Sequence, residues 1–120
     1  MKLIFFIGEI GLDFHKKIPK ALQKEVFEKQ FKIACDLQRP VNIHCVRAHG
    51  AMADIIEKYV GRKNLESTTN ETSSKMNIIL HSYAGKDEMT KRILGLNANF
   101  FFSFSLMAAK VIISLPSLQD

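Results

Sequence analysis

Four short apolar runs recur along the chain, and segments of helical periodicity separate them. The runs are Leu3–Ile7, Val41–Cys45, Met76–Leu80 and Asn99–Phe104. Continuous apolar runs of this length are typical of strands that are buried on both faces, as in parallel sheets. We therefore expect four buried strands, with the Gly8–Asp13 segment forming a loop after the first of them.

Four helices are expected between and after these strands. Residues 20–38 carry apolar side chains at helical spacing, and Pro40 prevents the helix from continuing. Ala51–Val60 and Lys86–Leu96 have similar patterns, and the apolar segment Leu106–Leu115 ends at a proline. Strands that alternate with helices favour a parallel sheet with right-handed crossovers. The sequence thus predicts an α/β fold built from βα repeats.

A side chain that can bind a metal lies at or just after the end of each of the first three apolar runs. Glu9 follows the first run, His44 lies near the end of the second, and His81 follows the third. In parallel α/β folds, functional side chains gather at the carboxyl ends of the strands, and neighbouring strands lie about 4.8 Å apart. We therefore expect these three side chains to converge on one ion. Imidazole with carboxylate suits zinc, manganese or iron, and carboxylate with water also suits magnesium.

Other polar residues near these positions have two interpretations each. Asp13 is either a partner that orients a metal ligand or a turn residue. Arg47 either contacts a substrate phosphate or is an ordinary surface cation. His15 and His49 lie in polar segments, so we expect them to be solvated rather than to bind a metal.

Length and composition add a few limits. The 120 residues suffice for a single domain, 1–120, in which the polar segment 62–75 is expected to be an exposed loop. The net charge of +5 is compatible with a polyanionic partner such as nucleic acid. Cys35 and Cys45 lie in apolar patterns, which is typical of reduced cysteines in an intracellular protein. No apolar run approaches the roughly 20 residues of a membrane span.

Five motifs resemble those of the TatD-related deoxyribonucleases, in the order in which that family carries them. They span residues 4 to about 105, and the ordered set is more specific than any one motif. The motif His81-Ser82-Tyr83-Ala84-Gly85, together with Arg47-Ala48, is most similar to eukaryotic members. The five motifs are Gly8-Glu9-Ile10-Gly11-Leu12-Asp13, Gln23 to Gln30, Arg39-Pro40-Val41-Asn42-Ile43-His44-Cys45-Val46-Arg47-Ala48, His81-Ser82-Tyr83-Ala84-Gly85 and Phe101-Phe102-Ser103-Phe104-Ser105.

The resemblance implies a TIM barrel, of which four βα units form about half, and hydrolysis of DNA phosphodiester bonds by a metal-activated water. It implies that Glu9 is catalytic and binds metal, and that His44 and His81 are metal ligands. It also implies one or two divalent ions, Mg²⁺, Mn²⁺ or Zn²⁺, and a cytoplasmic or nuclear location. DNA is the expected partner, without a membrane.

The sequence departs from the family pattern at two places. Family members carry a His-x-His pair on the first strand and an Asp on the last, and the 120 residues contain neither. We therefore expect exposed sheet edges, through which the chain could self-associate, and a weakened second metal position. Two alternatives follow: a catalytically inactive partial barrel that acts as a binding or assembly module, and a related metal-dependent hydrolase of amides or esters.

Overall fold

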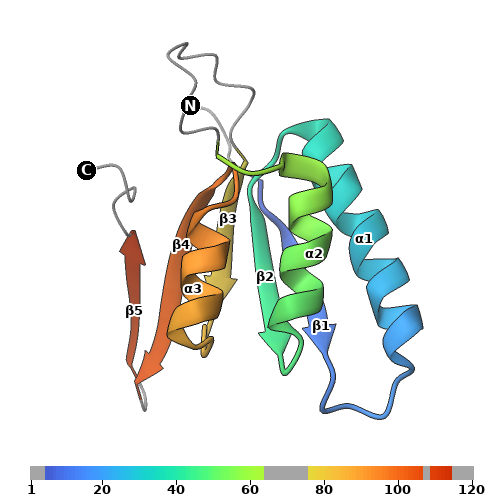
Figure 1. Cartoon of the computed structure of the whole chain (residues 1–120), viewed down its shortest axis with the longest axis horizontal. Helices are drawn as coiled ribbons and strands as arrows, with labels where there is room; N and C mark the ends of the chain where they lie inside the picture. The colour runs from blue at the N-terminus through green and yellow to red at the C-terminus, as the bar shows by residue number, and fades with distance from the viewer. Residues whose placement is uncertain (1–4, 64–75, 107–108, 115–120) are drawn as a thin grey trace.

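The computed structural model describes residues 5–63, 76–106 and 109–114. These residues form one five-stranded sheet and three helices (Figure 1). In chain order the elements are β1 (Ile7–Asp13), α1 (Lys20–Leu37), β2 (Val41–Val46), α2 (His49–Val60), β3 (Asn77–His81), α3 (Asp87–Leu94), β4 (Asn99–Leu106) and β5 (Ala109–Ser114).

The strands lie in sequence order, and the first four are parallel. A helix follows each of the first three strands, and all three helices cover the same face of the sheet (Figure 1). The predicted α/β fold of parallel βα repeats is therefore confirmed. Because no described helix covers the other face, polar side chains on that face can serve a site.

The core lies between the sheet and the helices. One row of paired residues crosses four strands on the helix side, and each of its members is at least nine-tenths buried: Ile10, Ile43, Leu80 and Phe102. The helices contribute fully buried side chains opposite this row, among them Phe31 from α1, Met52 from α2 and Ile93 from α3. Burial of such side chains contributes roughly 1.5–3 kcal/mol each.

Local sequence explains where the helices end and how they meet. Gln38 takes a left-handed conformation and donates its backbone N–H to the last turn of α1, and Pro40 then prevents further helix. Gly61 caps α2 through its N–H to Glu57. The rings of Phe31 and Tyr59 meet edge to face at 5.9 Å, which joins α1 to α2. These contacts fix the spacing of the first two βα units.

The first strand begins later than the sequence predicted. Phe5 and Phe6 are exposed, and the strand runs through the segment that was expected to be a loop. The prediction was wrong because it took the glycines as turn residues. In the structure, Ile10 and Leu12 alternate toward the core, so the segment has the period of a half-buried strand. Glu9 therefore lies within β1 and not beyond its end.

The last described element is a strand and not the predicted helix. β5 pairs antiparallel with β4 over six residue pairs, from Phe101–Ser114 to Leu106–Ala109. Apolar character alone did not distinguish the two states, but the β-branched residues Val111, Ile112 and Ile113 favour a strand. The expectation of a wholly parallel sheet is corrected accordingly. β5 covers the edge of β4 that the predicted four-stranded sheet would have left open.

Two further expectations concern the rest of the chain. Of the expected loop 62–75, residues 64–75 lie outside the described part. Arg62 is exposed and forms an isolated bridge with Leu96. In the described ranges, no helix is long and apolar enough to cross a membrane.

Candidate metal site

The sheet face opposite the helices carries the candidate ligands. Successive residues of a strand point to opposite faces, so the burial of Ile10 and Leu12 places Glu9, Gly11 and Asp13 on the open face. Gly11 pairs with His44, which in turn pairs with His81 on the next strand. Three neighbouring strands therefore present Glu9, His44 and His81 on one face.

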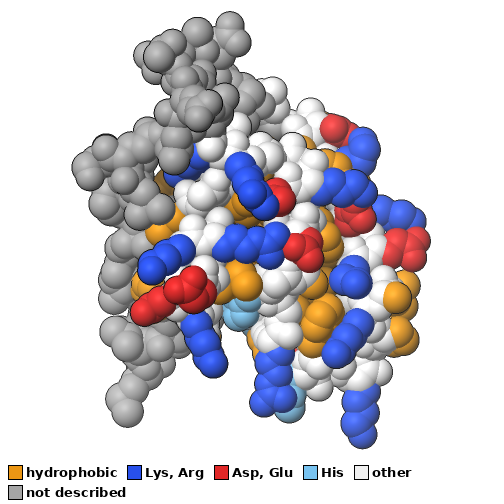
Figure 2. Space-filling model, viewed as in Figure 1, with side chains coloured by type: hydrophobic (Ala, Val, Ile, Leu, Met, Phe, Trp, Pro, Cys, Tyr) orange, Lys and Arg blue, Asp and Glu red, His pale blue; other side chains and the backbone are white. Residues whose placement is uncertain are grey.

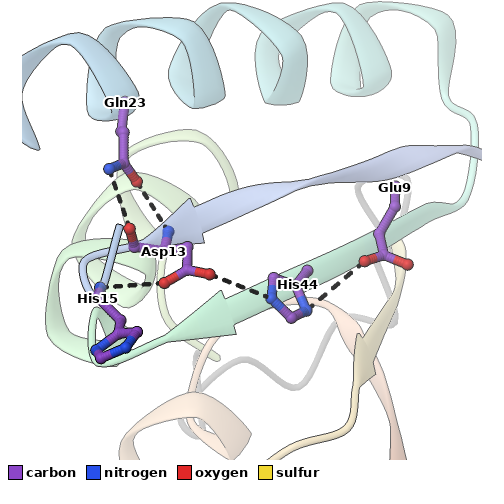
Figure 3. Close-up of polar contacts among 5 residues, drawn as sticks. All are labelled: Glu9, Asp13, His15, Gln23 and His44. Atoms are coloured by element: carbon purple, nitrogen blue, oxygen red, sulfur yellow. Dashed lines mark hydrogen bonds and ion pairs between the residues drawn. The ribbon is translucent and has the colours of Figure 1, made fainter. Parts of the chain in front are cut away.

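His44 lies between two carboxylates of β1 (Figure 3). Its Nδ1 is 3.6 Å from Oε1 of Glu9, and its Nε2 is 3.9 Å from Oδ2 of Asp13. Both distances exceed a normal hydrogen bond, so neither carboxylate is directly hydrogen-bonded to the ring. The side chains of Glu9 and His44 are 47% and 39% exposed, and both line a groove of about 380 Å³ along β1. The imidazole is thus accessible to an ion or a ligand.

Two glycines let β1 approach β2 closely enough for this arrangement. A Cβ atom on Gly11 would lie 1.7 Å from the backbone oxygen of His44, and one on Gly8 would lie 2.7 Å from that of Asn42. Neither position can carry a side chain unless the backbones move apart. The glycines that suggested a loop are therefore required by strand packing beside the site.

Gln23 of α1 holds the end of β1 in place, and sequence reasoning did not single it out for this role. Its Oε1 accepts the backbone N–H of Asp13 at 2.8 Å, and its Nε2 donates to the carbonyl oxygen of Asp13 at 3.0 Å (Figure 3). The same Nε2 lies 3.0 Å from the carbonyl oxygen of Ile18. The position of Gln23 in one of the family-like motifs was the only indication in the sequence.

Replacement of Gln23 by Leu is expected to lower the free energy of unfolding by about 1–3 kcal/mol, because it leaves partly buried backbone groups unpaired. Chemical denaturation measures this change. Gln30→Leu, at an exposed position of the same helix, is the matched control and should change stability by less than about 0.5 kcal/mol. Equal effects of the two variants would contradict the role assigned to Gln23.

The remaining candidates lie in different surroundings. Asp13 also accepts the backbone N–H of His15 at 3.0 Å, so it serves the turn after β1 as well as facing His44. Arg47 is exposed just beyond β2, and His15 is exposed as expected. His49, expected to be solvated, is instead half-buried, and its ring meets Tyr83 edge to face at 5.4 Å. Burial lowers the pKa of His49, because the charged imidazolium loses hydration there.

The two cysteines are unsuited to nucleophilic chemistry. Burial raises the pKa of both Cys35 and Cys45 to about 11, so each is a protonated thiol at neutral pH. Cys45 directly follows His44 but alternates to the helix side, where it packs against the core. Thiolate catalysis at this site is therefore not supported, although the cysteine and the histidine are adjacent in sequence.

The side chains on the open face have the chemistry of a divalent metal site. Carboxylate oxygen and imidazole nitrogen suit zinc or manganese, and His44 is accessible between its two carboxylates. In the described part of the chain, no three His, Cys, Asp or Glu side chains stand close enough together to hold an ion as they are placed. The residue types suit a metal, but the expected convergence of Glu9, His44 and His81 on one point is not seen among the described side chains. Glu9 and His44, 3.6 Å apart, are the candidate ligands that the structure brings together.

The fold and this donor set define a class of protein, a half-barrel of parallel βα units with candidate metal ligands on the open face of its sheet. The chain belongs to the TatD related DNase family, whose model matches residues 2–114. An amidohydrolase from Saccharomyces cerevisiae is similar over 81% of this chain, with a TM-score of 0.64 and 30% identity. The Escherichia coli TatD homologue YjjV has a TM-score of 0.60 over 78% of the chain, at 22% identity. The predicted family and fold are confirmed.

Several similar proteins are named as metal-dependent hydrolases or nucleases. The metal-dependent hydrolase YabD of Bacillus subtilis is 31% identical over 82% of this chain. The 3'-5' ssDNA/RNA exonuclease TatD of Pantoea ananatis is 37% identical over 49% of it, and the human 3'-5' RNA nuclease TATDN2 is 40% identical over 44%. The chain spans 33%, 23% and 7% of these three proteins respectively.

Proposed function

We propose that this chain contributes the metal site of a hydrolase that cleaves phosphodiester bonds in nucleic acid, with DNA as the expected substrate. The observation that carries the proposal is the position of His44 between Glu9 and Asp13, on the sheet face that also carries its register partner His81. Family membership and the names of the similar nucleases support the same activity.

Glu9, His44 and His81 are the proposed ligands of a divalent ion, which is Mg²⁺, Mn²⁺ or Zn²⁺. When bound, such an ion would lower the pKa of its water toward neutrality. The ion would also polarise a phosphoryl oxygen of the substrate. Glu9 is the proposed catalytic carboxylate, because it lies beside His44 and lines the groove into which a substrate would enter. Asp13 orients the imidazole of His44 through the charge of its carboxylate.

The prediction of self-association is part of the same proposal, and one observation supports it. Large apolar side chains are exposed along one line of α1, next to β1 at the sheet edge. Their exposure ranges from 46% to 60%, which is unusual for a helix that packs on one side only. A second copy that covers this side would remove them from water, and it would border the His44 groove, which Leu22 and Val26 also line. These residues are Leu22, Val26, Ile33 and Leu37.

The proposal is tested by incubating the purified chain with labelled single-stranded DNA, labelled RNA and p-nitrophenyl acetate, each with Mg²⁺, Mn²⁺ or Zn²⁺. Metal-dependent cleavage of DNA, suppressed by EDTA, is the expected result. Hydrolysis of the ester alone would favour the related amide and ester hydrolases. A folded chain that binds DNA and cleaves none of the three would indicate a binding module.

A further inference from the structure

A second hollow lies on the other side of the β2 end from the His44 groove. It has a volume of about 460 Å³, and the connections that follow β2 and β3 line it. His44 lines the groove, and the next residue, Cys45, points to the opposite face of β2 and lines the second hollow, so the two hollows lie on either side of the β2 end. A chain molecule that crosses the end of β2 would therefore reach both.

The lining of this hollow is basic. Arg47 and Lys86 contribute cationic groups, and Ser82 contributes a hydroxyl, whereas no Asp or Glu is among its described lining residues. Over residues 5–63 and 76–106, neither Arg47 nor Lys86 forms an ion pair, unlike Lys58, Arg62 and Arg92 on or beside the helices. Figure 2 shows Lys and Arg side chains along the edge of the molecule where the parallel strands end. The charged side chains that line the hollow are therefore all cationic, although Asp87 and Glu88 follow Lys86 in the first turn of α3.

The backbone around the hollow adds to this positive character. α2 begins at its lining residue His49 and, among the described residues, has neither a side-chain cap nor an acidic residue in its first turn. The helix dipole and free N–H groups of such a terminus favour an anion. Arg47 and Ser82 also take left-handed conformations, at φ of 53° and 50°, where the chain turns from each strand into the hollow. Such conformations cost free energy for residues other than glycine.

We propose that this hollow, lined by Arg47, Lys86 and Ser82, binds a backbone phosphate of the nucleic acid. That phosphate is a neighbour, on the same strand, of the phosphate at the metal site. The inference rests on the proposed function for its choice of ligand. Arg47 can donate two parallel hydrogen bonds to a phosphate, and Lys86 adds a point charge. Because these groups bind phosphate and not bases, the site contributes affinity and register but no sequence preference.

The test is binding of fluorescein-labelled single-stranded DNA, measured by fluorescence anisotropy in EDTA, so that no metal or cleavage is needed. The double variant Arg47→Gln/Lys86→Gln is expected to bind about tenfold more weakly. The slope of log affinity against log salt should be smaller by about 0.7 for each phosphate that the variant no longer neutralises. The charge-retaining variant Arg47→Lys/Lys86→Arg should recover most of the affinity. Circular dichroism confirms that each variant is folded.

The matched control is Lys24→Gln/Lys29→Gln, which removes the same charge from the exposed surface of α1. It should change affinity by less than about twofold. Unchanged binding by the pocket variant, or an equal loss in the control, would overturn the inference.

The result also separates this inference from the proposed function. A chain that binds through this pocket but never cleaves with Mn²⁺ refutes only the proposed activity, whereas cleavage with unchanged binding by the pocket variant refutes only the pocket.

Discussion

Glu9→Gln is expected to lower the rate of metal-dependent DNA cleavage by at least about a hundredfold. The substitution keeps the size of the side chain but removes the negative charge that lies 3.6 Å from His44. An amide oxygen is a poorer metal ligand than a carboxylate, and an amide cannot accept a proton near neutral pH. The loss should appear in kcat, because the carboxylate acts on the reacting groups. Initial rates at saturating Mn²⁺ and DNA measure it.

The fold should survive this change, since the Glu9 side chain is 47% exposed and the histidine beside it is accessible as well. Glu25→Gln is the matched control, because it removes one exposed carboxylate of α1 that pairs with Lys29 in the following turn. That variant should cleave at the rate of the unmodified chain. Equal activity of Glu9→Gln and the unmodified chain would refute the catalytic role of Glu9.

Gly11→Ala is expected to lower the free energy of unfolding by at least about 2 kcal/mol. The added Cβ would meet the backbone oxygen of His44 at 1.7 Å and its backbone carbon at 2.7 Å. A flexible side chain could rotate away, but a backbone carbonyl inside a sheet cannot, so β1 and β2 must separate. The same displacement moves His44 away from Glu9, and metal affinity should fall together with stability. Thermal or urea denaturation, followed by metal titration of the folded fraction, measures both effects.

Gly50→Ala is the matched control. A Cβ atom at Gly50 would meet no described atom within 4 Å, and the residue lies in the first turn of α2. Alanine has the higher helix propensity, so this variant should be unchanged in stability or gain up to about 1 kcal/mol. If the two alanine variants unfold alike, strand packing does not explain the glycine at position 11.

Much of the fold could be predicted because the relevant signals are local. The apolar run at Val41–Cys45 and the helical periodicity at 20–38 each specify an element without reference to the rest of the chain, and the structure confirms both within one residue or so. The β5 segment could not be predicted in this way. Its apolar pattern is compatible with helix or strand; the β-branched residues 111–113 favour a strand only weakly, and pairing with the open edge of β4, a tertiary feature, stabilises it.

For the site as well, some features follow from the local sequence and others depend on tertiary packing. The sequence places His44 and His81 near the ends of their strands, and the structure pairs them in register. It does not reveal that Asp13 faces His44, because that depends on the close approach of β1 permitted by Gly11. The sequence also does not reveal that Gln23 holds the end of β1, because its hydrogen bonds join residues ten positions apart. Both features depend on the packing of α1 and β2 around one strand.

Titration of the full chain with Mn²⁺ by isothermal calorimetry tests the metal site most directly. We expect saturable binding that weakens at least about tenfold in His44→Ala and is unchanged in His15→Ala, since His15 is an exposed histidine two residues beyond β1. His81→Ala should weaken binding as well. Absence of saturable binding in a folded chain, or equal affinity in His44→Ala and the unmodified chain, would contradict the assignment of a metal site to this face of the sheet.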